Sequence, residues 1–149
     1  MINYKLSFIE SPSEIEINLN SSKSESNRLL IIKSLSDNKI ELENLSHAND
    51  TVLLKNLIRS NSQNIWDAED AGTTMRFLTS FLAITKQGVL LTGTERMKKR
   101  PIKILVDALN KIGAEISYME KDGYPPIKIN RKISQIKESI SIRGDISSQ

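Results

Sequence analysis

Three short stretches of the chain combine basic side chains with serine, threonine or glycine, which suits them to binding anions. They read SKSESNR at 22–28, GTTMR at 72–76 and RMKKR at 96–100. In the first stretch, Ser24 and Arg28 are four residues apart and therefore share one face of a helix. A helix start carries free backbone N–H groups and the positive end of the dipole, so these stretches favour phosphates and carboxylates if helices begin there.

Arg76, in the second stretch, is the residue that most needs an explanation. The chain is predicted to become helical at about Thr73, with Gly72 or Thr73 as the N-cap. Apolar residues then recur at helical spacing, at Met75, Leu78, Phe81 and Leu82. Arg76 stands in the first turn, where a cation is mildly unfavourable unless an anion shares the site. This position supports an anion site and leaves open whether Arg76 itself touches the ligand.

The helices and strands around these three stretches must hold them in position, and the spacing of apolar residues predicts where those helices and strands lie. Helices are expected at about 24–36, at 50–59, from 73 onward and at 101–112. The last of these has Pro101 at its first position and Gly113 just past its end. Strands are expected at 4–9, 14–19, 40–44, 88–93, 115–120, 125–130 and 139–144. The predicted fold class is α/β (α+β).

Two segments resemble one another, which suggests a repeated unit. Residues 29–44 and 104–120 each run an apolar helix into a short alternating strand. In a repeated architecture equivalent helix ends lie on the same side, so the helix starts near Lys23, Gly72 and Arg100 are expected to face one cleft. The final residues, GDISSQ, look like a fourth such start.

Composition restricts the chemistry that is available. The chain has 149 residues, 38% of them hydrophobic and 26% charged, which is enough for one folded domain with a core. It has no cysteine and a single histidine, His47, so thiol chemistry and a histidine zinc cluster are excluded. No stretch approaches the roughly 20 apolar residues of a membrane span. A cytoplasmic protein with no membrane contact is expected, and the net charge of +3 favours an anionic partner.

Four other residues with functional chemistry are expected to have structural roles. Glu69 and Asp70 are adjacent carboxylates before a predicted helix, where they favour the dipole rather than form a catalytic pair. His47 is expected at the surface or in a turn, and Trp66 in packing.

Together these stretches resemble the successive motifs of a known family. SKSESNR, DAGTTMR, LTGTERMKKRPI, DGYPPIKI and GDISSQ look like the signatures of EPSP synthase, the 3-phosphoshikimate 1-carboxyvinyltransferase, in order and spacing. The related UDP-N-acetylglucosamine enolpyruvyl transferases typically carry a Lys-Asn pair at the first motif and a cysteine on a mobile loop. This chain has Lys23 followed by Ser24 and no cysteine.

The resemblance implies a two-domain enzyme about three times as long as this chain, built from βαβαββ units, with substrates between the domains. Residues 1–20 would supply the first strands of one domain. Residues 21–149 would form roughly the first two units of the other, so the sequence would be an N-terminal piece.

The implied reaction belongs to chorismate and aromatic amino acid biosynthesis. The family transfers the enolpyruvyl group of phosphoenolpyruvate to the 5-hydroxyl of shikimate 3-phosphate, by addition and elimination, without a metal or another cofactor. The resemblance further implies a full-length monomer that binds these small substrates and no nucleic acid. A piece of this length alone is expected to be inactive, because it supplies one wall of the site.

The motifs assign ligand roles to five residues in the first two-thirds of the chain. Lys23 is similar to the catalytic lysine that touches both substrates. Ser24 and Arg28 match residues that hold shikimate 3-phosphate, while Gly72 and Arg100 match phosphoenolpyruvate contacts. The glycine lets the ligand approach the backbone, and the arginine provides a forked, permanently charged group.

Three more residues are assigned at the end of the chain. Ser147 and Ser148 match serines that bind the phosphate of shikimate 3-phosphate, and Gln149 matches a glutamine placed between the two ligands.

The chain also departs from the family pattern. Asp70 stands where many members have asparagine, and Phe77 where many have proline, so the local shape near the phosphoenolpyruvate site and the response to the inhibitor glyphosate are open. The segment 57–72 is shorter than in many members, as if a strand or hairpin were trimmed.

Two other functional classes were considered. A nucleic-acid-binding module would use RMKKR as a phosphate patch, but the 5% of aromatic residues are scattered without a stacking pattern. A noncatalytic anion-binding domain of the same fold could lose Lys23, Arg28 and Arg100, and all three are present.

Overall fold

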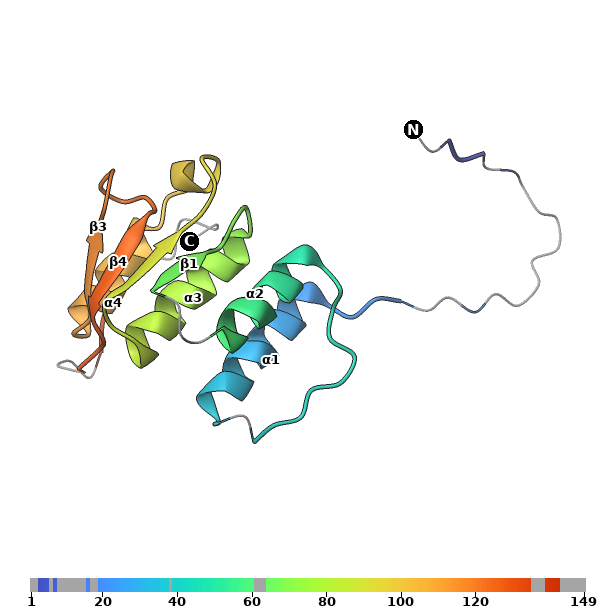
Figure 1. Cartoon of the computed structure of the whole chain (residues 1–149), viewed down its shortest axis with the longest axis horizontal. Coiled ribbons are helices and arrows are strands. Elements are labelled where there is room, and N and C mark those ends of the chain that lie inside the picture. Colours follow the sequence, from blue (N-terminus) through green and yellow to red (C-terminus); the bar gives the residue numbers. More distant parts are fainter. Residues whose placement is uncertain are drawn as a thin grey trace.

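The computed structural model describes residues 3–5, 7, 16, 19–37, 39–60, 64–134 and 139–142. Its helices are α1 (Lys23–Leu35), α2 (Asn49–Arg59), α3 (Gly72–Thr85) and α4 (Lys103–Lys111), with a short 3₁₀ helix η1 (Met97–Lys99). Its strands are β1 (Ile65–Asp67), β2 (Val89–Thr92), β3 (Glu115–Tyr118) and β4 (Ile127–Arg131). Figure 1 shows the sheet and α4 at one end of the molecule and the α1–α2 pair at the other, with α3 between them. This is the predicted mixed α/β class.

The four strands form one sheet in the order β1-β2-β4-β3. β1 and β2 are parallel, with Trp66 opposite Leu91, and α3 makes the crossover between them. The other pairs are antiparallel, with Leu91 opposite Ile127 in the β2–β4 pair. In chain order the elements from β1 to β4 read β-α-β-α-β-β apart from η1, which is the unit that the resemblance implies.

The hydrophobic core lies between the sheet and the two helices α3 and α4. Trp66, Leu91 and Ile127 are fully buried from the sheet side, and Val106 of α4 is fully buried opposite them. α3 is buried on most of its circumference, including its first residue, Gly72. A helix that is buried on most sides needs cover from two directions, and the α1–α2 pair supplies the second cover.

The predicted helices are confirmed, but two of their starts were wrong. α3 is capped by Ala71 rather than by Gly72 or Thr73, and no side chain bonds to its first N–H groups. α4 begins at Lys103, two residues after Pro101, because buried Ile102 takes the cap position in a non-helical conformation. At the other end of α4 the prediction holds: Gly113 follows the cap with φ of +104°, which suits glycine.

Two predicted strands are absent from the described residues, and one strand was missed. Residues 40–44 do not form a strand: at the end of the segment the Asn44 carbonyl accepts a hydrogen bond from the Ser21 hydroxyl, and just beyond it the Ser46 N–H donates to Ser26 Oγ at 2.9 Å. Serine side chains from around α1 thus take up backbone groups here that a neighbouring strand would otherwise pair. The segment 139–142 is likewise not a strand, and the rest of that predicted strand lies outside the described residues. β1 was missed because three residues are too few for a periodic signal.

The domain prediction stays a prediction. The strands expected at 4–9 and 14–19 fall mostly outside the described residues. Residues 64–134 hold one complete βαβαββ unit, while the described part of 21–60 contributes two helices and no strand. Within the described residues no helix is long and apolar enough to cross a membrane.

Candidate anion-binding site

An open hollow of about 340 Å³ lies where α1, α3 and the connection between η1 and α4 meet. Three of its lining residues are arginines, and none of the lining residues that the structure describes is acidic. The lining residues are Ser24, Arg28, Gly72, Thr73, Arg76, Phe77 and Arg100. The expected convergence of Ser24, Arg28, Gly72 and Arg100 on one cavity is therefore found, and the cavity is strongly positive.

Gly72 and Arg100 are in direct contact at the start of α3. A Cβ atom added to Gly72 would lie 2.1 Å from Nη1 of Arg100, so the guanidinium occupies the space that any side chain would need. The uncapped start of α3 lies beside the same guanidinium. Free backbone N–H groups next to a forked cation form a site suited to a phosphate or a carboxylate.

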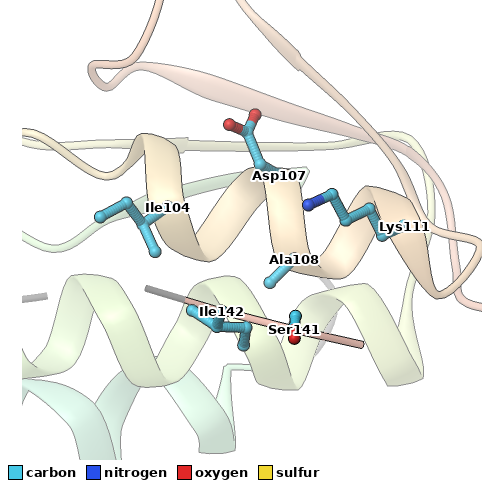
Figure 2. A pocket seen from close by; sticks show the side chains of 6 residues that line it. All are labelled: Ile104, Asp107, Ala108, Lys111, Ser141 and Ile142. Carbon is cyan, nitrogen blue, oxygen red and sulfur yellow. The ribbon is translucent and has the colours of Figure 1, made fainter. Parts of the chain in front are cut away.

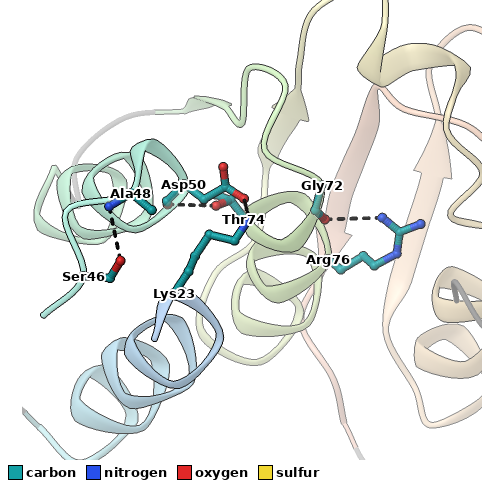
Figure 3. Close-up of polar contacts among 7 residues, drawn as sticks. All are labelled: Lys23, Ser46, Ala48, Asp50, Gly72, Thr74 and Arg76. Atoms are coloured by element: carbon teal, nitrogen blue, oxygen red, sulfur yellow. Dashed lines mark hydrogen bonds and ion pairs between the residues drawn. The ribbon is translucent and has the colours of Figure 1, made fainter. Parts of the chain in front are cut away.

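Arg76 bridges two pieces of backbone at this point. Its Nη1 donates to the Gly72 carbonyl at 3.3 Å and its Nη2 to the Pro101 carbonyl at 3.1 Å. Figure 3 shows the side chain running from α3 back to Gly72. Burial, and then the nearby charge of Arg100, lower the pKa of the Arg76 guanidinium. An anion in the hollow would relieve this repulsion between the two guanidinium groups.

Arg28 is held over the opposite part of the hollow by two contacts. Its Nη1 donates to the Ser24 carbonyl at 2.9 Å, and its Cζ lies 5.7 Å from the centroid of the Phe77 ring. An arginine over an aromatic face gains a cation–π attraction. Phe77, one of the departures from the family pattern, thus helps to place Arg28.

Of the predicted site residues that the structure describes, Lys23 is the one that does not line this hollow. Its Nζ forms an ion pair with Asp50 of α2 at 3.1 Å, and its side chain is 48% exposed (Figure 3). The Asp50 backbone carbonyl in turn accepts a hydrogen bond from Thr74 Oγ1 at 3.1 Å. Lys23 is thus one residue along α1 from the hollow, and its ammonium group points to the start of α2.

Asp50, Glu69 and Asp70 line a neighbouring acidic hollow on the other side of the α3 start. The Thr94 hydroxyl donates to the Asp70 carboxylate. Asp50 was not among the sequence candidates, and no spacing rule could have found it, because its pairing with Lys23 joins two different helices 27 positions apart.

A further hollow, of about 170 Å³, lies between α4 and residues 139–142 (Figure 2). Its charged residues are one of each sign, Asp107 and Lys111, and the rest of the lining is apolar apart from Ser141. It shares no residue with the arginine-lined hollow and lacks that concentration of positive charge.

Of the remaining residues considered in the sequence, three lie outside the described part of the chain and two are placed as predicted. Ser147, Ser148 and Gln149 lie outside the described residues. His47 is exposed and Trp66 is fully buried, as predicted.

Comparison with known proteins identifies the family. The model of the EPSP synthase family, 3-phosphoshikimate 1-carboxyvinyltransferase, matches residues 52–149. A protein of that name from Bacteroides fragilis (strain YCH46) is 45% identical over 144 residues, which cover 95% of this chain. The chain belongs to the EPSP synthase family.

Other members of the EPSP synthase family agree with this assignment. The 3-phosphoshikimate 1-carboxyvinyltransferase of Histophilus somni (strain 2336) is 37% identical over 162 residues, covering 90% of this chain and 37% of its own length. An EPSP synthase structure from Acinetobacter baumannii shares the fold, with a TM-score of 0.68 at 18% identity, covering 80% of this chain and 32% of that one. The chain spans about a third of the length of the curated EPSP synthases that it matches.

Proposed function

We propose that this chain is one wall of an EPSP synthase active site. The complete protein would transfer the enolpyruvyl group of phosphoenolpyruvate to the 5-hydroxyl of shikimate 3-phosphate and release phosphate. The observation that carries this proposal is the single hollow that joins Ser24 and Arg28 to Gly72 and Arg100. Its chemistry suits two anionic substrates bound side by side, and relatives over nearly the whole chain bear the name of this enzyme.

Each half of the hollow receives one substrate in this proposal. Ser24 and Arg28 hold shikimate 3-phosphate, and Gly72 and Arg100 hold phosphoenolpyruvate at the uncapped start of α3. Two substrates that both carry phosphate and carboxylate groups repel one another, and the guanidinium groups of Arg28, Arg76 and Arg100 offset that repulsion. Holding the two reactants together lowers the entropic part of the barrier.

The reaction needs several proton transfers, and the residues of this wall do not supply all of the groups for them. In the addition step the substrate hydroxyl loses a proton as its oxygen attacks C2 of phosphoenolpyruvate, and C3 gains a proton to become a methyl group. In the elimination step the methyl group returns a proton and phosphate leaves. Lys23 is the one residue of this wall to which we assign a catalytic role, where its ammonium group touches both substrates. This requires it to leave or share its ion pair with Asp50.

Removing the Arg100 guanidinium tests the proposal in the full-length protein. Arg100→Ala should raise KM for phosphoenolpyruvate by roughly 10- to 150-fold, because a charge-assisted hydrogen bond is worth about 1.5–3 kcal/mol. KM for shikimate 3-phosphate should change much less. Arg96→Ala, which removes an exposed arginine from the same basic run, is the matched control. Equal rises for both substrates, or an equal effect of the control, would contradict the assignment.

From the resemblance, the proposal also assigns phosphate contacts to Ser147 and Ser148, a place between the two ligands to Gln149, and a monomeric state to the complete protein. The apolar pattern and the scattered aromatic residues of the sequence support a cytoplasmic location and the lack of a nucleic-acid partner.

A further inference from the structure

Arg100 reaches the hollow from a short connection, so something must hold its backbone in place. It follows the three-residue helix η1 and has an extended conformation, with φ of −96° and ψ of 122°. Its residue is exposed, while its guanidinium must stay against Gly72. A long flexible side chain keeps one position more reliably when the backbone that carries it cannot move.

Residues just before and just after Arg100 both contact the same turn, residues 120–123. Before it, Lys98 Nζ lies 3.0 Å from a carboxylate oxygen of Glu120. After it, the Ile102 N–H donates to the Gly123 carbonyl at 2.8 Å, and Lys103 Nζ lies 3.3 Å from Asp122. The turn follows β3, so these attachments tie the Arg100 backbone to the sheet.

Two of these attachments are ion pairs between side chains, and the Lys98–Glu120 pair is the one that lies on the η1 side of Arg100. Lys98 also contacts Glu95 at 3.0 Å, but Glu95 belongs to the same connection and its side chain is 84% exposed. Only Glu120 links Lys98 to a separate element. The Lys98 side chain is 23% exposed, and both carboxylates raise the pKa of its ammonium group, chiefly Glu120.

We propose that Lys98, through its ion pair with Glu120, is a positioning residue for Arg100. The pair holds the η1 turn against the end of β3, so that the Arg100 guanidinium stays on Gly72 and meets phosphoenolpyruvate in a fixed geometry. This inference rests on the proposed function, in which Arg100 binds that substrate. Neither Lys98 nor Glu120 lines the hollow, so neither touches substrate in this arrangement.

Two variants of the full-length protein test whether Lys98 acts by positioning Arg100 or only through its own positive charge. Lys98→Met should raise KM for phosphoenolpyruvate by roughly threefold to tenfold and leave KM for shikimate 3-phosphate within about twofold, since a misplaced binding group weakens one contact. Glu120→Gln should also raise KM for phosphoenolpyruvate. Charge alone predicts the opposite for Glu120→Gln, because losing a negative charge near the site would strengthen binding of an anion.

Matched controls complete the test. Lys99→Met removes the same charge from the neighbouring exposed residue and should leave both KM values within about twofold. Lys98→Arg, which keeps a cation opposite Glu120, should leave KM for phosphoenolpyruvate near the parent value. Because an exposed ion pair adds little to stability, the Tm of each variant should stay within about 2 °C of the parent.

The outcomes distinguish this inference from the proposed function. If Arg100→Ala raises KM for phosphoenolpyruvate but Lys98→Met and Glu120→Gln do not, the positioning role is overturned and the function stands. If Glu120→Gln lowers that KM, or Lys99→Met matches Lys98→Met, the effect is one of charge and the inference fails. If Arg100→Ala itself has no selective effect, the assignment of Arg100 to phosphoenolpyruvate fails first.

Discussion

The guanidinium of Arg100 fills the space that a side chain at position 72 would need, with Nη1 2.1 Å from where a Cβ of Gly72 would lie. The two residues are 28 positions apart, and each constrains the other: the glycine admits the guanidinium, and a larger residue at position 72 would force the guanidinium to move. Arg76 bonds to the backbone carbonyls of Gly72 and Pro101, on either side of the contact. The start of α3 and the connection before α4 thus form one unit.

Gly72→Ala should therefore weaken phosphoenolpyruvate binding in the full-length enzyme without unfolding it. The new methyl group displaces the end of a flexible side chain rather than backbone, so we expect KM for phosphoenolpyruvate to rise about tenfold or more as the charge-assisted contact is lost. Steady-state kinetics with each substrate varied in turn measures this. Gly88→Ala is the control: position 88 has φ of +74° and open space, so it should lower stability and leave KM unchanged. A normal KM in Gly72→Ala would contradict the assigned contact.

Phe77→Leu should weaken binding of shikimate 3-phosphate. Leucine keeps an apolar side chain but removes the ring over which Arg28 lies, and a cation–π contact at an exposed site is worth about 0.5–1 kcal/mol. We expect KM for shikimate 3-phosphate to rise roughly twofold to fivefold, while Phe77→Tyr, which keeps the ring, stays near the parent value. If Phe77→Tyr and Phe77→Leu behave alike, the ring does not place Arg28.

Tyr118→Phe should leave the fold as stable as the parent or make it slightly more stable. The Tyr118 hydroxyl is buried without a hydrogen-bond partner among the described residues, and burial raises its pKa to about 12. Removing an unsatisfied buried hydroxyl gains up to about 1 kcal/mol of unfolding free energy. Chemical denaturation measures this gain. A loss of more than about 1 kcal/mol would mean that the hydroxyl has a partner in solution.

The same hydroxyl makes the parent protein sensitive to alkaline pH. Because the folded-state pKa is raised, the neutral form is favoured by folding, and its contribution to stability is present below about pH 10 and lost as pH rises toward 12. Tyr118→Phe should remove this part of the alkaline decline in stability. Identical pH profiles for the two proteins would contradict the raised pKa.

The 149 residues alone should show no synthase activity. Transfer requires groups on both sides of the ligands and exclusion of water from the intermediate, and the hollow described here is open. Phosphate release is the assay, with the full-length enzyme as positive control. Calorimetry with shikimate 3-phosphate should show at most weak binding that falls with added salt, since it rests on partly exposed charge. Turnover that persists after any full-length contaminant is removed would show that this wall is sufficient.

The helices were predictable because each is encoded by local spacing. Apolar residues every three or four positions in α3 and α4 must lie on one face, whatever the rest of the fold does. The strands were less predictable. Residues 40–44 alternate like a strand, yet the backbone of Asn44 and of nearby Ser46 bonds to serine side chains from around α1. β1 forms in three residues because β2 lies beside it. Strand formation depends on a partner, which alternation alone does not supply.

The sequence by itself determined the family, the helices and the preference of the site for anions, because motifs, apolar spacing and arginine chemistry are all local properties. Only the tertiary structure decided which charges meet: Arg28 lies over Phe77, Lys98 pairs with Glu120, and Lys23 pairs with Asp50 rather than lining the hollow. Each of these contacts joins residues more than 20 positions apart in the chain. Their geometry follows from how helices and sheet pack, and packing is a property of the whole chain.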